Sequence, residues 1–269
     1  MFITYKINDH IYQIKDPMGV LTTLIIGETS AILIDTGYGI FNLKEYVRKI
    51  TDKKLIVMNS HGHMDHSCGN YLFDEVYLNH LDNDLVKKHN SLEWRKRNIQ
   101  TAKRMNLIDE SYDINEYLSK NEGNIKDLKI GSVFNIGNLN IEIIDLRGHT
   151  TGSVGFLIKE DRILVTSDGI CPFVWIFLEE STTFKVYKEM LKETLNLEFD
   201  HFLVGHGAGK LLPRSRMEEF YQTALDLTIE KSVKVEFNNF DNANSYCFTL
   251  GKMYDQDDSG IVFDPNRME

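Results

Sequence analysis

The 269-residue sequence lacks several features that identify common classes of protein. No apolar run approaches the ~18 residues of a membrane-spanning helix, and the opening MFITYKINDH has no basic stretch followed by a hydrophobic one. Cysteine is scarce: Cys68, Cys171 and Cys247 are odd in number and irregularly spaced, which favours reduced thiols over a disulfide framework. We therefore expect a cytoplasmic protein without membrane association.

Basic residues are also fewer than acidic residues. The chain has 30 Lys and Arg against 40 Asp and Glu, which gives a formal net charge of -10. Such a chain repels a phosphate backbone at long range, so the expected partner is a small-molecule substrate and not nucleic acid. Linkers and low-complexity tracts are lacking too, which predicts a single domain over residues 1–269. The sequence leaves homo-oligomerisation open.

Short β-rich runs separated by turn residues dominate two parts of the chain. The first part contains TYKI, IYQIK, LTTLIIG, AILIDT and KLIVMNS, and the later part contains SVFNI, LNIEIIDL, SVGFLIK and RILVTSD. Between them, residues 81–125 are charged and show helical spacing, which predicts a helical lid insertion that forms one wall of a substrate pocket.

Helices are expected in three further places. One lies around NLKEYVRKI, one is capped by Ser181 or Thr182, and one starts at a capping box formed by Ser215 and Glu218. Two β-rich halves with accompanying helices predict an α/β fold of the αββα type, in which two mixed β-sheets form a sandwich with helices on the outer faces.

Histidine is unevenly distributed. Three of the nine histidines, His61, His63 and His66, lie with Asp65 in the heptapeptide SHGHMDH. Two more, His149 in RGHTTGS and His206 in VGHGAG, lie beside glycines that permit tight loops. The other four, expected to be ordinary hydrogen-bonded residues, are His10, His80, His89 and His201.

The clustered residue types indicate a catalytic metal site. Neutral imidazoles and carboxylates are good ligands for zinc, manganese and iron, and alternate residues of an extended loop direct His61 and His63 toward one point. Asp65 and His66 can then face a second ion. Mixed His and Asp ligands usually leave room for water or substrate, whereas structural zinc sites more often use cysteine.

With these motifs, and in their order, the sequence resembles the metallo-β-lactamase superfamily over nearly its full length. Asp35 in IDTG and Asp168 in SDG complete the pattern. The ligands that the resemblance implies are His61, His63 and His149 for one ion, Asp65, His66 and His206 for the other, and Asp168 for both. Asp35 would accept a hydrogen bond that orients a ligand imidazole or the histidine loop; the alternative is an Asp that starts a turn before Gly37.

The resemblance implies the metallo-β-lactamase fold and a binuclear metallo-hydrolase. Two divalent transition-metal ions, zinc by default and manganese or iron as alternatives, would share a water whose pKa falls toward ~7. Asp65 or Asp168 would carry the proton. The expected substrate is a small molecule with an ester, lactone, thioester or phosphodiester bond. Rival functions are a metal-dependent nuclease of the same fold and a non-catalytic metal-binding sensor.

Departures from individual branches narrow the function. Zinc β-lactamases have cysteine in place of Asp168, and flavodiiron oxygen reductases have glutamate in place of His63, so neither antibiotic hydrolysis nor redox chemistry is favoured. Lactonases of the quorum-quenching type have tyrosine at the position of Cys171, which weakens a lactonase assignment. The tail KVEFNNFDNANSYCFTL predicts strands and loops and lacks the glutathione-binding pattern of glyoxalase II.

Four residues are candidates for substrate binding: Trp94, Arg97, Arg104 and Cys171. Arg97 and Arg104 are seven residues apart, so on a helix they share one face and can bind a carboxylate or phosphate of an anionic substrate. The alternatives are a solvated charged face for the arginines and a buried, unreactive thiol for Cys171. Tyr112 and Tyr117 are expected to pack in the core of the insertion.

Overall fold

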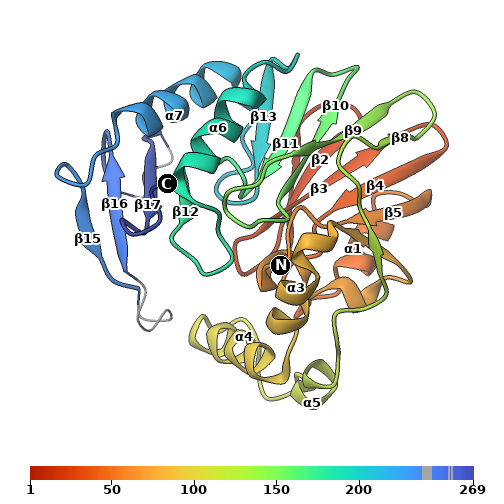
Figure 1. Ribbon diagram of the computed structural model, residues 1–269. Coiled ribbons are helices and arrows are strands. Elements are labelled where there is room, and N and C mark those ends of the chain that lie inside the picture. The colour runs from red at the N-terminus through yellow and green to blue at the C-terminus, as the bar shows by residue number, and fades with distance from the viewer. Residues whose placement is uncertain (238–243, 254, 256) are drawn as a thin grey trace.

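Two β-sheets packed face to face form the centre of the fold (Figure 1). The computed structural model describes residues 1–237, 244–253, 255 and 257–269. The N-terminal sheet contains, in order, β1 (Ile3–Lys6), β2 (Ile11–Lys15), β3 (Leu21–Ile26), β4 (Ser30–Ile34), β5 (Lys54–Met58), β6 (Val76–Leu78) and β7 (Ile125–Asp127). The central sheet contains, in order, β14 (Leu212–Pro213), β13 (His201–Val204), β11 (Ile163–Ser167), β10 (Val154–Ile158), β9 (Asn140–Asp145) and β8 (Val133–Asn135).

Both sheets are mixed, as predicted. Pairing is antiparallel from β1 to β4 and parallel from β4 to β7, whereas in the central sheet β11 pairs parallel with β13. Successive strand residues point to opposite faces. In β4, Ile32 and Ile34 therefore enter the core between the sheets, while Ala31 and Leu33 pack on the outer side. Both faces of β4 are therefore buried, one against the central sheet and the other against the residues that pack on the outer side of the N-terminal sheet.

Helices cover the outer faces, which confirms the αββα architecture. Leu43 and Val47 of α1 (Leu43–Arg48) pack on the N-terminal sheet, and α6 (Phe184–Thr194) and α7 (Arg214–Asp226) pack on the central sheet (Figure 1).

The predicted helix caps were wrong. Thr183, not Ser181 or Thr182, caps α6 by accepting a hydrogen bond from Val186 N, and α7 follows Pro213 with no side-chain cap. Ser215 is the second residue of α7, whereas the serine of a capping box lies just before the first residue of the helix.

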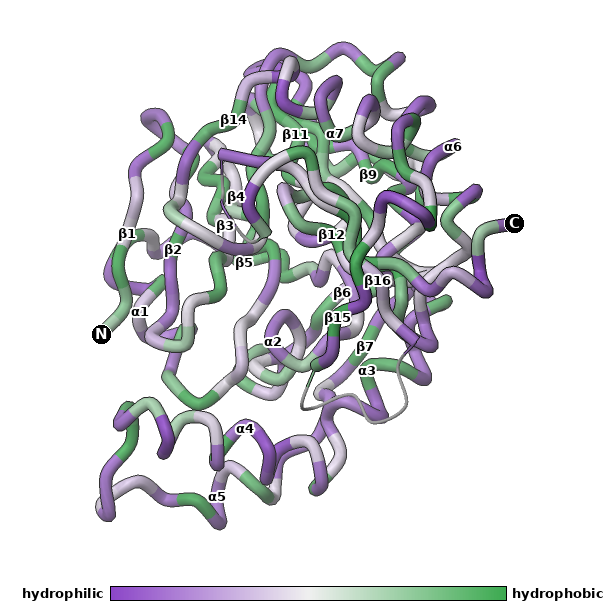
Figure 2. The backbone as a smooth tube through the Cα atoms, turned by 90° about the vertical axis from the view of Figure 1, so that its left-hand side faces the viewer, coloured by the Kyte–Doolittle hydropathy of each residue, from purple (hydrophilic) through white to green (hydrophobic). Residues whose placement is uncertain are grey.

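The segment between β6 and β7 is helical, as predicted. It contains η2 (His80–Asp82), α3 (Asn83–His89), α4 (Leu92–Arg104) and α5 (Ile114–Leu118), and α4 and α5 lie side by side at one end of the sandwich (Figures 1 and 2). Tyr117 packs with Ile99 and Ala102 in a small core of its own, and Tyr112 packs against this core, as expected. The Arg95 side chain is fully buried and donates to the carbonyl oxygens of residues 68, 90 and 121.

A further sheet, the C-terminal sheet, was not predicted. It contains β12 (Phe173–Ile176), β17 (Gly260–Phe263), β16 (Ser245–Thr249) and β15 (Val233–Val235), in that order. The tail therefore does form strands, although its residues 238–243 lie outside the described residues. Within the part of the chain that the structure describes, no helix is long and apolar enough to cross a membrane.

Candidate metal centre

All seven predicted metal ligands come together at one end of the sandwich. His61 and His63 follow β5, and Asp65 and His66 lie in the short helix α2 (Met64–Ser67), just before η1 (Asn70–Leu72). The three remaining ligands follow strands of the central sheet: His149 after β9, Asp168 after β11 and His206 after β13. Their donor atoms form two groups that could each hold an ion: the three-histidine group of His61, His63 and His149, and the mixed group of Asp65, His66, Asp168 and His206.

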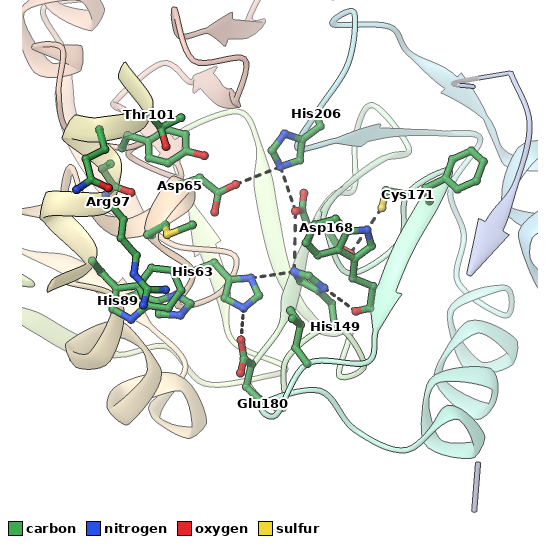
Figure 3. A pocket seen from close by; sticks show the side chains of 18 of the residues that line it. His63, Asp65, His89, Arg97, Thr101, His149, Asp168, Cys171, Glu180 and His206 are labelled. Carbon is green, nitrogen blue, oxygen red and sulfur yellow. Dashed lines mark hydrogen bonds and ion pairs between the residues drawn. The ribbon is translucent and has the colours of Figure 1, made fainter. Parts of the chain in front are cut away.

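In the three-histidine group, three imidazole nitrogens face one another. His63 Nδ1 lies 3.0 Å from His61 Nε2 and 2.9 Å from His149 Nε2. The outer nitrogens bond to oxygen atoms: His63 Nε2 donates to Glu180 Oε1 over 2.8 Å, and His149 Nδ1 donates to the Trp175 carbonyl over 2.8 Å (Figure 3). These acceptors fix the protons on the outer nitrogens, so the inner nitrogens present lone pairs to a common point.

Burial disfavours charge on two of these imidazoles, those of His61 and His149. It lowers the pKa of His61 well below its usual value and lowers that of His149 to about 4. Neutral imidazoles whose lone pairs converge repel one another and fit a cation between them.

Two buried polar atoms of the mixed group lack a hydrogen bond. Among the described residues, neither His66 Nε2 nor Asp168 Oδ1 has a hydrogen-bond partner. Asp168 Oδ2 lies 3.1 Å from His206 Nε2, 3.5 Å from His66 Nε2 and 3.9 Å from His149 Nε2, so it faces both groups. Buried polar atoms are rarely left unsatisfied, and an ion held by the mixed group would satisfy both.

Electrostatics also favour a cation at the mixed group. Burial opposes charge on His66, yet the carboxylates of Asp65 and Asp168 outweigh burial and raise the pKa of His66 well above its usual value. Burial also opposes charge on His206, but the same two carboxylates raise the pKa of His206 to about 10. Burial alone would raise the pKa of both carboxyl groups, but the two imidazoles hold these pKa values well below their usual range. The group is therefore stabilised by positive charge, which a divalent ion supplies.

Asp35 and Gly205 support the mixed group. Asp35 Oδ2 accepts from His66 Nδ1 over 2.9 Å, and Oδ1 accepts from Ser60 N over 2.7 Å, so Asp35 contacts both a ligand imidazole and the start of the histidine loop. At Gly205 a Cβ would lie 2.5 Å from Asp168 Oδ1. The residue beside His206 must therefore be glycine for Asp168 to keep its position.

A cavity of about 630 Å³ opens above both groups (Figure 3). The four predicted substrate residues, Trp94, Arg97, Arg104 and Cys171, all line it. Arg97 donates to Glu93 on the same helix over 2.7 Å, and its guanidinium lies 4.6 Å from the centre of the Trp94 ring. Both arginines lie on one face of α4, as their spacing predicts.

Cys171 matches the expectation of an unreactive thiol. Burial raises the pKa of this thiol well above its usual value, and its Sγ donates to the Asp168 carbonyl over 3.9 Å. Its place on the cavity wall is thus a matter of shape and not of nucleophilic chemistry.

Glu180 and His89 are among the residues of the site that the sequence did not predict. Glu180, from the loop before α6, orients His63, and no motif marks it. His89 was expected to be an ordinary residue, but its ring lies on the cavity wall between His63, at 5.1 Å between centroids, and Trp94, at 4.3 Å. The sequence offers no signal for either, because their contacts with His63 join segments that are separate in the chain.

Curated relatives are distant and partial. Acyl-coenzyme A thioesterase MBLAC2 from Bos taurus and from Homo sapiens are each 24% identical to the chain over 160 residues. These matches cover 54% of this chain and 56% of each relative, so the chain spans little more than half the length of the relatives it matches.

Solved structures share the fold at low identity. A metallo-β-lactamase from Pontibacter korlensis has a TM-score of 0.60 at 15% identity, covering 84% of this chain and 100% of that one. The sec-alkylsulfatase Pisa1 from Pseudomonas sp. has a TM-score of 0.63 at 14% identity, covering 84% and 42%.

The family match covers the whole metal centre. The model of the metallo-β-lactamase superfamily matches residues 16–211, a segment that contains Asp35 and every ligand of both groups. The chain belongs to the metallo-β-lactamase superfamily.

Proposed function

We propose that the protein is a binuclear metal-dependent hydrolase that cleaves an ester or thioester bond of a small anionic molecule. The observation that carries this proposal is the position of Asp168, whose carboxylate faces both ligand groups on the floor of one cavity. Zinc is the proposed metal, with manganese and iron as alternatives, because His and Asp ligands suit all three.

Ions held in such a centre lower the pKa of water and polarise a carbonyl oxygen. Around them, the imidazoles of the three-histidine group supply neutral donors. Asp65 and Asp168 both line the cavity, so their carboxylates are placed to accept a proton from the attacking water and pass it to the leaving sulfur or oxygen. The bond from water oxygen to the carbonyl carbon forms, and the bond to the leaving group breaks.

Two observations support an anionic acyl substrate. Arg97 and Arg104 place positive charge on the cavity wall of an otherwise acidic protein. The curated relatives are named as acyl-coenzyme A thioesterases, and a thioester is a carbonyl electrophile of the kind that this site would take. The net charge of -10 supports a small molecule over nucleic acid as substrate. The free thiols of Cys68, Cys171 and Cys247 fit the proposed cytoplasmic location.

Metal analysis and a substrate panel test the proposal. Protein expressed in metal-replete medium should contain about two transition-metal ions per chain. The panel contains p-nitrophenyl esters, acyl thioesters, lactones, a phosphodiester and a short RNA. We expect the highest kcat/KM for thioesters or esters. Less than one ion per chain overturns the binuclear centre, the highest kcat/KM on RNA or the phosphodiester overturns the bond type, and no turnover of any substrate by the two-metal protein indicates the rival sensor.

A further inference from the structure

The two side walls of the cavity differ in chemistry. The α4 wall contributes one aromatic ring, that of Trp94, and five polar or charged side chains: Arg97, Asn98, Gln100, Thr101 and Arg104. Among the described residues, the opposite wall, which we call the β12 wall, contributes apolar side chains and one thiol: Cys171, Pro172, Phe173, Trp175 and Leu178. A ligand that satisfies both walls must have one polar end and one apolar end.

Strand alternation places two aromatic rings on the β12 wall. Val174 and Ile176 are buried in the core beside the central sheet, whereas Phe173 and Trp175 are half-buried and line the cavity. Phe173 pairs in register with Gly260 of β17, and a Cβ at that glycine would overlap the Phe173 ring. Glycine at position 260 therefore allows the Phe173 ring to lie against the neighbouring strand.

The β12 wall is fixed to the metal centre. The Trp175 carbonyl accepts the hydrogen bond that orients His149, and Cys171 follows Asp168 by three residues. Behind the wall, the Trp175 ring packs 4.8 Å from the Phe237 ring, which in turn stacks on Phe177 at 5.0 Å. An acyl group whose carbonyl lies at the metals thus meets a rigid aromatic surface.

We infer that Phe173 and Trp175 form the subsite for an apolar acyl group of the substrate, and that its anionic leaving group lies along the α4 wall. This inference rests on the proposed hydrolase function and adds its acyl specificity. The residues of the subsite lie within the segment that matches the superfamily, residues 16–211, whereas β17, the strand that supports the β12 wall, lies beyond it. Each methylene buried there should strengthen binding about two- to fourfold.

A binding experiment tests the subsite without turnover. Both tryptophans of the chain, Trp94 and Trp175, line the cavity, so their fluorescence reports its occupancy. The metal-loaded protein is titrated with acetate, butyrate, hexanoate and octanoate, which share the carboxylate and differ only in chain length. We expect the Kd to fall at least tenfold from acetate to hexanoate. An equal Kd for all four acids overturns the subsite, even where esters are hydrolysed.

Variants assign the effect to the β12 wall. Phe173→Ser should remove most of the dependence of Kd on chain length, measured by calorimetry, while the metal content stays unchanged. Val233→Ser is the matched control, because Val233 lies on the same C-terminal sheet, is 55% exposed and does not line the cavity. If Phe173→Ser fails to retain metal, Trp175→Gln replaces it. Wild-type chain-length dependence in a metal-replete wall variant overturns the assignment.

The same comparison applies to activity. The kcat/KM for p-nitrophenyl hexanoate should exceed that for the acetate at least tenfold in the wild type and in Val233→Ser, and less than threefold in Phe173→Ser. A flat profile in an active wild-type enzyme overturns the subsite alone. Absence of hydrolysis of every ester and thioester, with chain-length-dependent binding retained, overturns the proposed function and leaves an acyl-binding cavity.

Discussion

Asp35 Oδ2 and His66 Nδ1 form a hydrogen bond of 2.9 Å in which both side chains are almost fully buried. Asp35 adopts a left-handed backbone conformation with φ of 67°, which is unusual for a residue other than glycine. Ser167, also left-handed with φ of 48°, donates to the same carboxylate over 3.0 Å. Two strained residues therefore meet at the oxygen that orients a metal ligand, as is common at functional sites.

Replacing this carboxylate should weaken metal binding. In Asp35→Asn, one of the two oxygens that accept from His66 and from Ser60 N becomes an amide nitrogen, so the side chain can no longer accept both hydrogen bonds. We expect the metal affinity to fall by about 10- to 100-fold, as for other partners of metal-ligating histidines. Competition with a chromophoric chelator measures the affinity. Asp161→Asn is the matched control, because Asp161 bonds to His10 over 2.6 Å in an Asp–His pair that is not part of either ligand group. Equal effects of both variants would contradict the role of Asp35.

Asp168 should matter to both ions. In Asp168→Ala, both ligand groups lose the shared carboxylate, while the hydrophobic core is untouched. We expect the metal content to fall below one ion per chain and turnover to fall more than tenfold, or about 1.4 kcal/mol in the barrier. Elemental analysis, esterase assays and circular dichroism check these outcomes, with the exposed Asp200→Ala as control. A folded Asp168→Ala protein that keeps two ions would rule out a shared ligand.

Four of the seven candidate ligands form a local signal in the sequence. His61, His63, Asp65 and His66 lie within six residues, so one loop and one short helix suffice to assemble them. Glu180 differs, because it lies 117 residues from His63 and meets it only when the loop before α6 folds over the cavity. No periodicity or spacing in the sequence encodes such a contact.

The same contrast applies to the fold. Short β-rich runs bounded by turn residues predict the strands of the sandwich, because strands such as β4, β10 and β11 are buried on both faces and are apolar throughout. The C-terminal sheet escapes prediction because β12 has only four residues and pairs with β17, at residues 260–263. The C-terminal sheet is stabilised by pairing and packing between residues that are far apart in the sequence, and a local sequence pattern does not reveal such contacts.

Asp16 should make stability depend on pH. Burial raises the pKa of Asp16 to about 6, above the usual 3.8, although Oδ1 accepts from Met18 N and Val20 N. The folded state therefore disfavours the ionised carboxylate, and stability is lost as the pH rises from about 4 through 6. Asp16→Asn keeps the accepting oxygen without the charge. We expect this variant to gain on the order of 1–3 kcal/mol of unfolding free energy at pH 7.5 and almost nothing at pH 4.

Urea unfolding of the wild type and of Asp16→Asn at pH 4, 5.5 and 7.5 measures the difference in their unfolding free energies. The contributions of the other titrating groups are the same in both proteins and cancel in this difference. The gain should grow between pH 4 and 7.5. A gain of the same size at all three pH values would indicate better packing, and it would contradict removal of a buried charge as the cause.

The arginines of the α4 wall should select for substrate charge. Arg97 and Arg104 line the cavity, whereas Lys96 and Lys103 lie on the same helix, are exposed and do not line it. Replacing both arginines with glutamate should raise the KM for an anionic acyl thioester at least tenfold and change that for a neutral ester less than twofold, with metal content unchanged. A control variant in which Lys96 and Lys103 are both replaced by glutamate changes the net charge by the same amount. It therefore measures how much of the effect on KM comes from the long-range electrostatic field of the protein. If the lysine variant matched the arginine variant, or if neutral and anionic substrates suffered equally, the arginines would belong to a solvated helix face and the leaving group would lie elsewhere.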